Sequence, residues 1–396
     1  MLFQALKNEF KGQSVSSGFG LWPSITSSSV VNTNSALTLS AFYNAIDIIS
    51  NDFAKLPKSL YQKIEGDRKK IQGHSINYIL SRRPNKLMTS FMFDKMMIQY
   101  AILKGNAYAI IERDYKEKVI ALHLVEQDKT SVTVWKKNRK LYYEIDGEMY
   151  SSDDVIHVPG FSFDGITGIG VVSFAAKSLG VNLKSQNFAD EYYDSKGEGI
   201  AVVTSSKSMD PDAKIRLSNA ITSRLSQKGL VKATVLDESN TFQHIKLTPQ
   251  ESQFLQTNSN GVLEVARWLN LPPHKLKSLE NATFSNIEHQ EIAHVSDSVL
   301  PWSLKFQNEY TVKLLSVAEE LEGYYIQFNT KSLLRADLKA QSEFFSKMIY
   351  AGVYTRNEVR ALFELNSLEG LDSPLTPVNT NILEQIDALL KQKQDG

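Results

Sequence analysis

Apolar residues recur every three or four positions in several stretches of the chain, which is the spacing of an amphipathic helix. One such run begins at Ser40 and ends at Pro57, because proline cannot continue a helix. Residues 74–85 predict a short helix, and residues 88–104 predict a longer one that stops before Gly105 and gives way to a strand. The apolar face of the first helix carries Phe42, Ala45, Ile46, Ile49, Phe53 and Leu56.

Alternating apolar and polar residues mark the strands of the N-terminal half. Residues 58–64 predict one strand, and residues 119–159 hold several short alternating runs separated by turn residues such as "KKNRK" and "DGE". This succession predicts an antiparallel meander. Helices and strands together predict one α+β domain over residues 39–170.

Long helical patterns dominate after residue 170. Residues 171–198 predict a helix, although Gly180 weakens the pattern. Residues 199–247 predict a small α/β insert in which two strands flank a helix, and residues 248–271 predict a second long helix. The apolar face of the first of these helices carries Val172, Ala175, Ala176, Leu179 and Leu183.

The second long helix has firm signals at both ends. Thr248 and Glu251 form a capping-box pattern at its start, and two prolines from Pro272 onwards end it. A polar loop follows over residues 272–285. Ser285 and Glu288 repeat the capping box, and residues 286–323 predict a further long helix that is kinked near Pro301.

The two ends of the chain differ in pattern. Residues 324–396 predict a strand, then helices at 331–351 and 355–366, and finally a short terminal helix. Residues 11–38 are rich in Ser, Thr, Asn and Gly and lack periodicity. This predicts a flexible arm over residues 1–38 that contributes little to the subunit fold and wraps around a neighbour. The apolar residues of the terminal helix are Ile382, Ile386, Leu389 and Leu390.

The amino-acid composition excludes several classes of functional site. Forty-four basic and 44 acidic residues give a net charge of zero, so any contact with nucleic acid must be local. The chain has no cysteine, which excludes disulfides, thiolate nucleophiles and cysteine-ligated metals. Neither a secretory leader nor a run of about 18 apolar residues is apparent, so we expect a soluble protein made in the cytoplasm and no membrane partner.

Motifs for catalysis are largely missing. "GFSFDG" has Asp164 where a nucleophile elbow needs its second glycine, and "GITGIG" has the wrong glycine order for a dinucleotide site. His289 and His294 are five residues apart, roughly 140° around a helix, so they do not converge on one ion and are expected to be solvated or to face a partner. We therefore expect no cofactor, no metal and no enzyme, unless an unrecognised site exists.

Three segments resemble the phage portal proteins of long-tailed double-stranded DNA phages. An Arg-Pro-Asn turn leads into a helix and then a Gly-Asn-Ala-Tyr strand entry. A proline pair precedes a polar loop and a helix, and a third segment lies near the C-terminus. One departure is Gly168-Ile169-Gly170-Val171, where the family has a proline-containing helix entry. The matching residues are Arg83, Pro84, Asn85, Met88, Thr89, Gly105, Asn106, Ala107 and Tyr108; Pro272, Pro273, Ala282, Thr283, Ser285, Asn286 and Glu288; and Gly352, Thr355, Asn357, Glu358 and Arg360.

The resemblance implies a phage portal fold of class α+β with a wing, a helical stem, a small α/β clip and a helical crown, assembled as a cyclic ring of about 12 subunits at a capsid vertex. Residues 39–170 would form the wing, 171–198 and 248–271 the stem, and 199–247 the clip. The C-terminal helices of residues 324–396 would complete the wing and crown. Implied partners are double-stranded DNA, the terminase large subunit, a head–tail connector and the major capsid or scaffold protein.

Two sets of residues follow as candidate sites. The loop at 272–285 would be the tunnel loop that reaches towards DNA. The clip carries an excess of basic residues that would dock the terminase or connector, although a solvated face explains them equally well. The alternatives are another phage connector protein or a nucleic-acid enzyme, which metal-dependent DNA cleavage would reveal. The loop residues are His274, Lys275, Lys277, Asn281 and Thr283, and the docking residues are Lys207, Lys214, Arg216, Arg224, Lys228 and Lys232.

Overall fold

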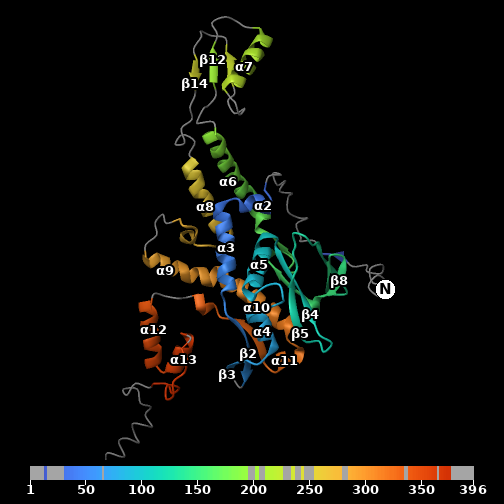
Figure 1. The fold of residues 1–396 in the computed structure, drawn as a ribbon, viewed down its shortest axis with the longest axis vertical. Helices are drawn as coiled ribbons and strands as arrows, with labels where there is room; N and C mark the ends of the chain where they lie inside the picture. The colour runs from blue at the N-terminus through green and yellow to red at the C-terminus, as the bar shows by residue number, and fades with distance from the viewer. Residues whose placement is uncertain are drawn as a thin grey trace, which may run out of the picture. The chain divides into compact units, whose positions relative to one another are not determined.

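The protein divides into two compact units, Met1–Thr330 and Lys331–Gly396, and each is described by itself. Figure 1 shows the order of the helices and strands. Among the residues that the structure describes, no helix is long and apolar enough to cross a membrane. The computed structural model describes residues 13–15, 31–64, 67–194, 201–204, 210–225, 233–236, 242–244, 254–278, 284–333, 338–363 and 365–375.

The core of the first unit forms where α3 (Ser40–Ala54) packs against α5 (Ser90–Leu103), and Phe306 of α10 (Leu300–Leu314) contacts Phe53 of α3. All six apolar residues predicted for the face of α3 are buried, which confirms that pattern. Phe53 of this face contacts Phe306 and Phe328, with ring centroids 4.7 and 5.3 Å away. Contacts among rings from three distant segments therefore fix the centre of the core.

A buried ion pair lies beside these rings. Lys58 Nζ donates a hydrogen bond to Asp94, and the Tyr310 hydroxyl lies 3.4 Å from the same carboxylate. The two charged side chains are only 3% and 2% exposed. Burial lowers the pKa of Lys58 and raises the pKa of Asp94, while the attraction between the two charges opposes both shifts.

The strands are antiparallel as predicted, but they form separate sheets rather than one meander. One sheet has the order β5-β4-β9, a second has the order β1-β6-β7-β8, and a third has the order β15-β2-β3. Pairings between strands far apart in sequence cause this split. The bounds are β1 Gln13–Ser14, β2 Lys58–Ile64, β3 Asp67–Lys70, β4 Asn106–Arg113, β5 Val119–Leu124, β6 Val132–Lys137, β7 Lys140–Ile145, β8 Glu148–Ser151, β9 Val155–Pro159 and β15 Tyr324–Phe328.

The expectation that residues 1–38 add little to the subunit is wrong for two short segments. β1 pairs with β6 at the edge of the second sheet. Helix α2 (Thr33–Leu37) starts at a capping box between Asn32 and Ser35, and Ala36 is fully buried. The rest of the predicted arm lies outside the described residues.

The Arg-Pro-Asn turn joins α4 (Ser75–Ser81) to α5 and is tied to β5. Asn85 is buried, and its Nδ2 donates to the carbonyl of Leu122 at 2.7 Å. Its Oδ1 accepts from the backbone amides of Leu87 and Met88 at 2.8 and 3.0 Å. A short amide side chain can satisfy all three backbone groups at once, which explains why this turn uses asparagine.

The Gly-Asn entry to β4 is a close crossing of two backbone segments. Gly105 has φ +89°, and a Cβ built there would lie 2.4 Å from the amide nitrogen of Gly170. The amide of Gly160 donates to the carbonyl of Gly105 at 2.7 Å. A Cβ at Gly168 or Gly170 would likewise meet backbone atoms at 1.9 and 2.2 Å, so both glycines belong to this crossing, which strands β10 (Phe161–Ser162) and β11 (Gly168–Ile169) complete.

Asn106 extends the crossing into a buried polar chain. Its amide exchanges two hydrogen bonds with the backbone of Gly168 at 2.7 and 2.8 Å, which orients the amide. Burial lowers the pKa of His157 to about 3, so this ring is neutral at pH 7. His157 Nε2 therefore donates to Asn106 Oδ1 at 2.9 Å, and its Nδ1 accepts from the Tyr143 hydroxyl at 3.1 Å.

Two long helices pack side by side after the crossing, as Figure 1 shows. α6 spans Val171–Asp194 and α8 spans Phe254–Trp268, and α6 passes through Gly180 without a break. The five apolar residues predicted for α6 are all buried, which confirms that helical face. The predicted start of the second helix, at residue 248, lies outside the described residues.

The insert between the two helices contains the predicted strand–helix–strand and one strand more. β12 (Ala201–Thr204) lies between β13 (Ala233–Leu236), to which it is parallel, and β14 (Phe242–His244), to which it is antiparallel. Helix α7 (Pro211–Leu225) connects β12 to β13. The parallel pair requires such a crossover helix, so the insert is a compact βαββ unit.

The region predicted as one helix over 286–323 is divided. α9 (Phe284–Ala293) continues through a π-helical turn, His294–Val299, into α10. Ser285 lies within α9 rather than at its cap. A separate helix, α11 (Val317–Leu321), starts at a capping box made by Ser316 and Glu319. The break predicted at Pro301 is thus replaced by a π turn immediately before it.

The second unit contains helices α12 (Leu338–Tyr350) and α13 (Arg356–Leu362). The predicted capping box at Thr355 and Glu358 is present, with bonds of 2.7 and 3.1 Å. Asn357 is buried. Its Nδ2 donates a hydrogen bond to the carbonyl of Leu368, and its Oδ1 accepts one from the amide of Leu368. This asparagine therefore holds the segment that follows α13. The predicted terminal helix lies outside the described residues.

Candidate functional site

The predicted polar loop at 272–285 has an ordered beginning. Asn270 has φ +52° and ends α8, with the amide of Leu271 bonded to the carbonyl of Ala266 at 2.8 Å. A short 3-10 helix, η3 (Pro273–Leu276), follows, and Leu276 is buried. The first residues of the loop are consequently part of the folded unit.

His274 is held by the helix that follows the loop. Its Nδ1 lies 2.6 Å from Gln290 Oε1, and its Nε2 lies 2.9 Å from Glu291 Oε1. The side chain is only 9% exposed. Because Gln290 and Glu291 belong to α9, the two ends of the loop are joined through this ring.

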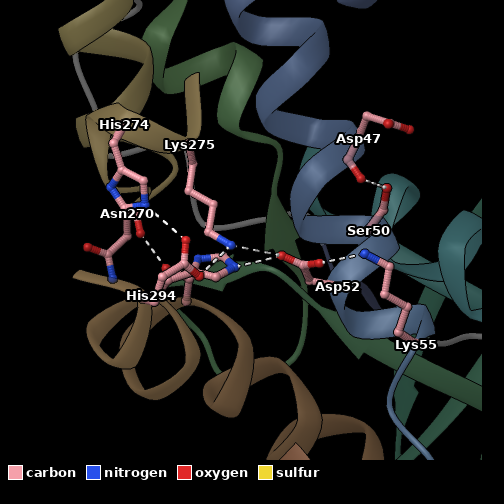
Figure 2. A network of polar contacts seen from close by, with 10 residues as sticks. Asp47, Ser50, Asp52, Lys55, Asn270, His274, Lys275 and His294 are labelled. Carbon is pink, nitrogen blue, oxygen red and sulfur yellow. Dashed lines mark hydrogen bonds and ion pairs between the residues drawn. The ribbon is translucent and has the colours of Figure 1, made fainter. Parts of the chain in front are cut away.

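Lys275 is held by two carboxylates. Its Nζ lies 2.8 Å from Glu291 Oε2 and 3.6 Å from Asp52 Oδ2. Figure 2 shows Lys275 and His294 pointing towards the same side of Asp52 from two different segments. His294 Nε2 lies 3.0 Å from the same Asp52 oxygen, and Lys55 bonds to the other oxygen at 3.0 Å. Asp52 is therefore shared by three nitrogen groups.

We call Asp52, His274, Lys275, Glu291 and His294 the loop-base cluster. Burial alone would raise the pKa of Asp52, but the hydrogen bonds from His294 and Lys55 and the charge of Lys275 lower it to about 2. Burial likewise opposes ionisation of Glu291, and its bonds to His274 and Lys275 hold its pKa below the usual range. Both carboxylates are ionised at neutral pH, and the cluster joins α3, η3, α9 and the π turn.

The structure changes the expected roles of the histidines. His294 is 1% exposed and bonded to Asp52, so the expectation of a solvated or partner-facing ring is wrong for it. His289 is exposed, in line with that expectation. Burial arises because the π turn directs His294 towards α3, a segment about 240 residues earlier in the sequence.

The predicted DNA-facing loop residues fall into two groups. The side chains of His274 and Lys275 are engaged within the protein, so Lys275 does not offer an unpaired ammonium group. Lys277 is exposed at φ +63°, immediately after η3. Asn281 and Thr283 lie outside the described residues.

The predicted docking residues are only partly described. Lys214, Arg216 and Arg224 belong to α7, and Arg216 is exposed. Lys207, Lys228 and Lys232 lie outside the described residues.

Among the described residues, no group of three or more His, Asp or Glu side chains is placed to hold a metal ion. Asp164, from the rejected nucleophile-elbow motif, accepts bonds from the amides of Ile166 and Thr167 at 2.7 and 2.8 Å. Its carboxylate shapes the turn between β10 and β11.

Comparisons with known proteins agree with the fold. The sequence profile of the family described as phage portal protein matches residues 40–364. The portal protein of Enterobacteria phage HK97 is 25% identical over 376 residues, which cover 89% of this chain and 87% of the relative.

Two solved structures share the fold at low identity. The HK97-family phage portal protein from Corynebacterium diphtheriae has a TM-score of 0.55 at 15% identity and covers 78% of this chain and 98% of its own. A chain in the neck of the native gene transfer agent particle, computed with C12 symmetry, has a TM-score of 0.54 at 15% identity. That alignment covers 92% of this chain and 99% of the neck chain.

Proposed function

Because the chain belongs to the phage portal protein family, we propose that about 12 copies form a ring at one vertex of a capsid. DNA enters through the ring during packaging by the terminase and leaves through it after the head joins the tail. The subunit is made in the host cytoplasm and ends in the virion. It acts as a conduit and not as an enzyme.

The family match carries this proposal, and the order of the elements supports the assignment of parts. The paired helices α6 and α8 suit the stem, and the βαββ insert between them suits the clip that meets the terminase and later the connector. The α+β region of residues 39–170 suits the wing, which the C-terminal helices of residues 324–396 complete together with the crown.

The loop after η3 is the part that reaches towards DNA. Lys277 is repeated by the symmetry of the ring, so about 12 ammonium groups form a belt around the duplex. Contacts of this kind go to phosphates, carry no sequence information and weaken as salt rises, which suits a duplex that slides. Asn281 and Thr283 belong to the same loop, while His274 and Lys275 hold its base.

Microscopy of the purified protein tests the ring, because an annulus with a central hole is hard to mimic. A monomer of 44.6 kDa at micromolar concentration would contradict the ring. Cleavage of DNA in the presence of a divalent metal by the pure protein would contradict a purely structural role.

The loop is tested with Lys277→Glu, and Lys140→Glu at an exposed hairpin tip is the matched control. Rings should remain intact by microscopy for both variants. DNA packaging, or retention of the packaged genome, should fall for Lys277→Glu alone, and more steeply at low salt. Equal packaging by both variants across a range of ionic strengths would show that the charge of Lys277 does not contribute to packaging.

The clip is tested by reversing charge at Arg216 and Arg224 together. Binding to the terminase large subunit or to the connector should slow and lose its salt dependence, because complementary charges mainly raise association rates. The ring itself should persist. Unchanged binding kinetics at low salt would contradict the docking surface.

A further inference from the structure

Helices α12 and α13 of the second unit lack a core of their own. Among the residues of this unit that the structure describes, Asn357 alone is buried, and every apolar side chain keeps some exposure to solvent. Tyr350, Val353 and Leu362 are exposed by 68, 62 and 54%. Because burial of apolar surface is the main favourable term in folding, we expect a further segment to cover these helices.

An aromatic patch joins the two helices. The ring centroid of Phe345 in α12 lies 5.3 Å from that of Phe344 and 5.6 Å from that of Phe363, at the end of α13. The ring of Tyr354, in the turn between the helices, lies 6.3 Å from that of Phe345. We call these four residues the aromatic patch. Phe344 and Phe363 are 47 and 48% exposed, so the patch continues to the surface of the unit.

The sequence that follows the described residues of this unit has the pattern of an amphipathic helix. Its apolar residues recur at positions i, i+1, i+4, i+7 and i+8, which places them on one face roughly 120° wide. Asn381 and Glu384 are three residues apart, as in a helix N-cap whose acidic partner follows at the third helical position. Lys391 and Lys393 suit the C-terminal end of a helix, where positive charge is favourable. The apolar residues are Ile382, Leu383, Ile386, Leu389 and Leu390.

We call residues 381–393 the terminal segment. A helix of this length extends about 20 Å, which matches the length of α12 over Leu338–Tyr350. Isolated helices shorter than about 12–15 residues are only marginally stable in water. The apolar face of the terminal segment therefore needs another apolar surface on which to pack.

The terminal segment is tethered close to the aromatic patch. The described part of the chain reaches Leu375, whose carbonyl oxygen would lie 3.0 Å from a Cβ built on Gly352, in the turn between α12 and α13. The stretch from Leu375 to Ile382 spans at most about 25 Å when it is extended, which exceeds the length of α12. So short a linker gives an effective concentration on the order of millimolar, which favours the patch of the same subunit over that of any other copy.

We propose that the terminal segment forms a helix whose aliphatic face covers the aromatic patch of its own subunit and completes the core of the second unit. The rings of the patch and the aliphatic side chains of the segment exclude water from one another. Glu384, Asp387 and Lys391 lie on the opposite side of the helix and remain in water. The inference does not depend on the proposed ring, because both surfaces belong to one chain.

Hydrogen exchange of the full-length protein is the first test. The double variant Ile386→Ser, Leu389→Ser removes apolar side chains from the contact, and Gln385→Ser, Gln392→Ser is the matched control outside the apolar face. Amide exchange in α12 and α13 should become at least about 10-fold faster in the first variant. It should be unchanged in the control, and exchange in α3 and α5 should be unchanged in both variants.

Unchanged exchange in α12 and α13 of the Ile386→Ser, Leu389→Ser variant overturns the proposal. Equal acceleration in the control variant overturns it as well, because the effect would then not come from the apolar face of the terminal segment.

A second test leaves the terminal segment unaltered. A photo-reactive benzoylphenylalanine, placed at Phe344 in one variant and at Phe363 in another, should form crosslinks to peptides from residues 381–393 on irradiation. In protein assembled from a mixture of isotope-labelled and unlabelled copies, both peptides of each crosslink should carry the same label. Mixed labels would show that the terminal segment of another copy covers the patch, which overturns the proposal. Crosslinks to residues 1–330 or to another protein, or no crosslink at either position, overturn it too.

Discussion

Two regions of the first unit hold charged side chains away from bulk water, and they do so in different ways. The Lys58–Asp94 pair is closed, because both side chains are almost completely buried among the rings of Tyr310 and Phe328. The loop-base cluster is open at its edges. Asp52 is 13% exposed, whereas Glu291 is 43% exposed.

The comparison separates two uses of charge. A closed pair has a large desolvation cost that is offset only while its partner and the nearby Tyr310 hydroxyl stay in place, so it fixes one arrangement of the core. An open cluster keeps contact with water and loses less when one member is removed. The closed pair thus fixes the arrangement of the core, and the open cluster positions the base of the loop.

The largest effect is expected from Lys58→Met, which leaves Asp94 buried without its partner. The free energy of unfolding should fall by about 3–5 kcal/mol, measured by denaturant titration. The double variant Lys58→Met, Asp94→Asn should recover much of this loss, because no uncompensated charge remains. Equal losses in the single and double variants would show that packing, not charge, causes the effect.

A smaller effect is expected from Asp52→Asn in the loop-base cluster. Partial exposure screens its interactions, so the loss should be about 1–2 kcal/mol by the same measurement. Local hydrogen exchange should rise in η3 more than in α5. A loss as large as that of Lys58→Met would erase the distinction between the closed pair and the open cluster.

The dependence of the unfolding free energy on acid pH further tests the contribution of Asp52 to the open cluster. The pKa of Asp52 is lowered from 3.8 to about 2, so its contribution is fully present above pH 3.8 and disappears as the pH falls through about 2. The difference in unfolding free energy between the unaltered protein and Asp52→Asn should therefore shrink as the pH falls from about 4 to about 2. A constant difference over that range would contradict the assigned pKa.

The smallest effect is expected from Lys55→Ala. Lys55 bonds to Asp52 at 3.0 Å but is 57% exposed, so the loss should be about 0.5 kcal/mol or less. Lys275→Ala is the informative comparison, since Lys275 is only 19% exposed and contacts two carboxylates. Equal losses in the two variants, measured by thermal unfolding, would mean that burial does not govern this cluster.

Local pattern was enough to predict most helices and strands. The apolar faces of α3 and α6, the end of α5 before Gly105 and the capping box at Thr355 depend on residues only a few positions apart. Strand pairing was not predictable in the same way. The strands predicted as one meander belong to separate sheets, because β4 pairs with β9, about 45 residues further along the chain. The local alternation of apolar and polar residues does not encode that pairing.

The candidate site shows the same limit. Composition was enough to select Lys275 and Lys277 as candidate loop residues. It could not predict that Lys275 is paired with carboxylates while Lys277 is exposed. Lys275 is paired because folding brings Asp52, more than 220 positions earlier, beside it. The π turn at His294–Val299 had no sequence signal other than Pro301, and the burial of His294 follows from that turn.

The π turn also bears on how the gene can change in length. A π turn holds about one residue more per turn than an α-helix, so removing one residue from it would restore ordinary helical winding and leave α10 in nearly the same orientation relative to α9. Removing one residue inside α10, between Phe306 and Tyr310, would instead rotate Tyr310 by roughly 100° out of the core. Single-residue deletions should therefore be tolerated better in residues 294–299 than in the body of α10, and the exposed β6–β7 hairpin tip, with positive φ at Asn138 and Arg139, can also change length at little cost.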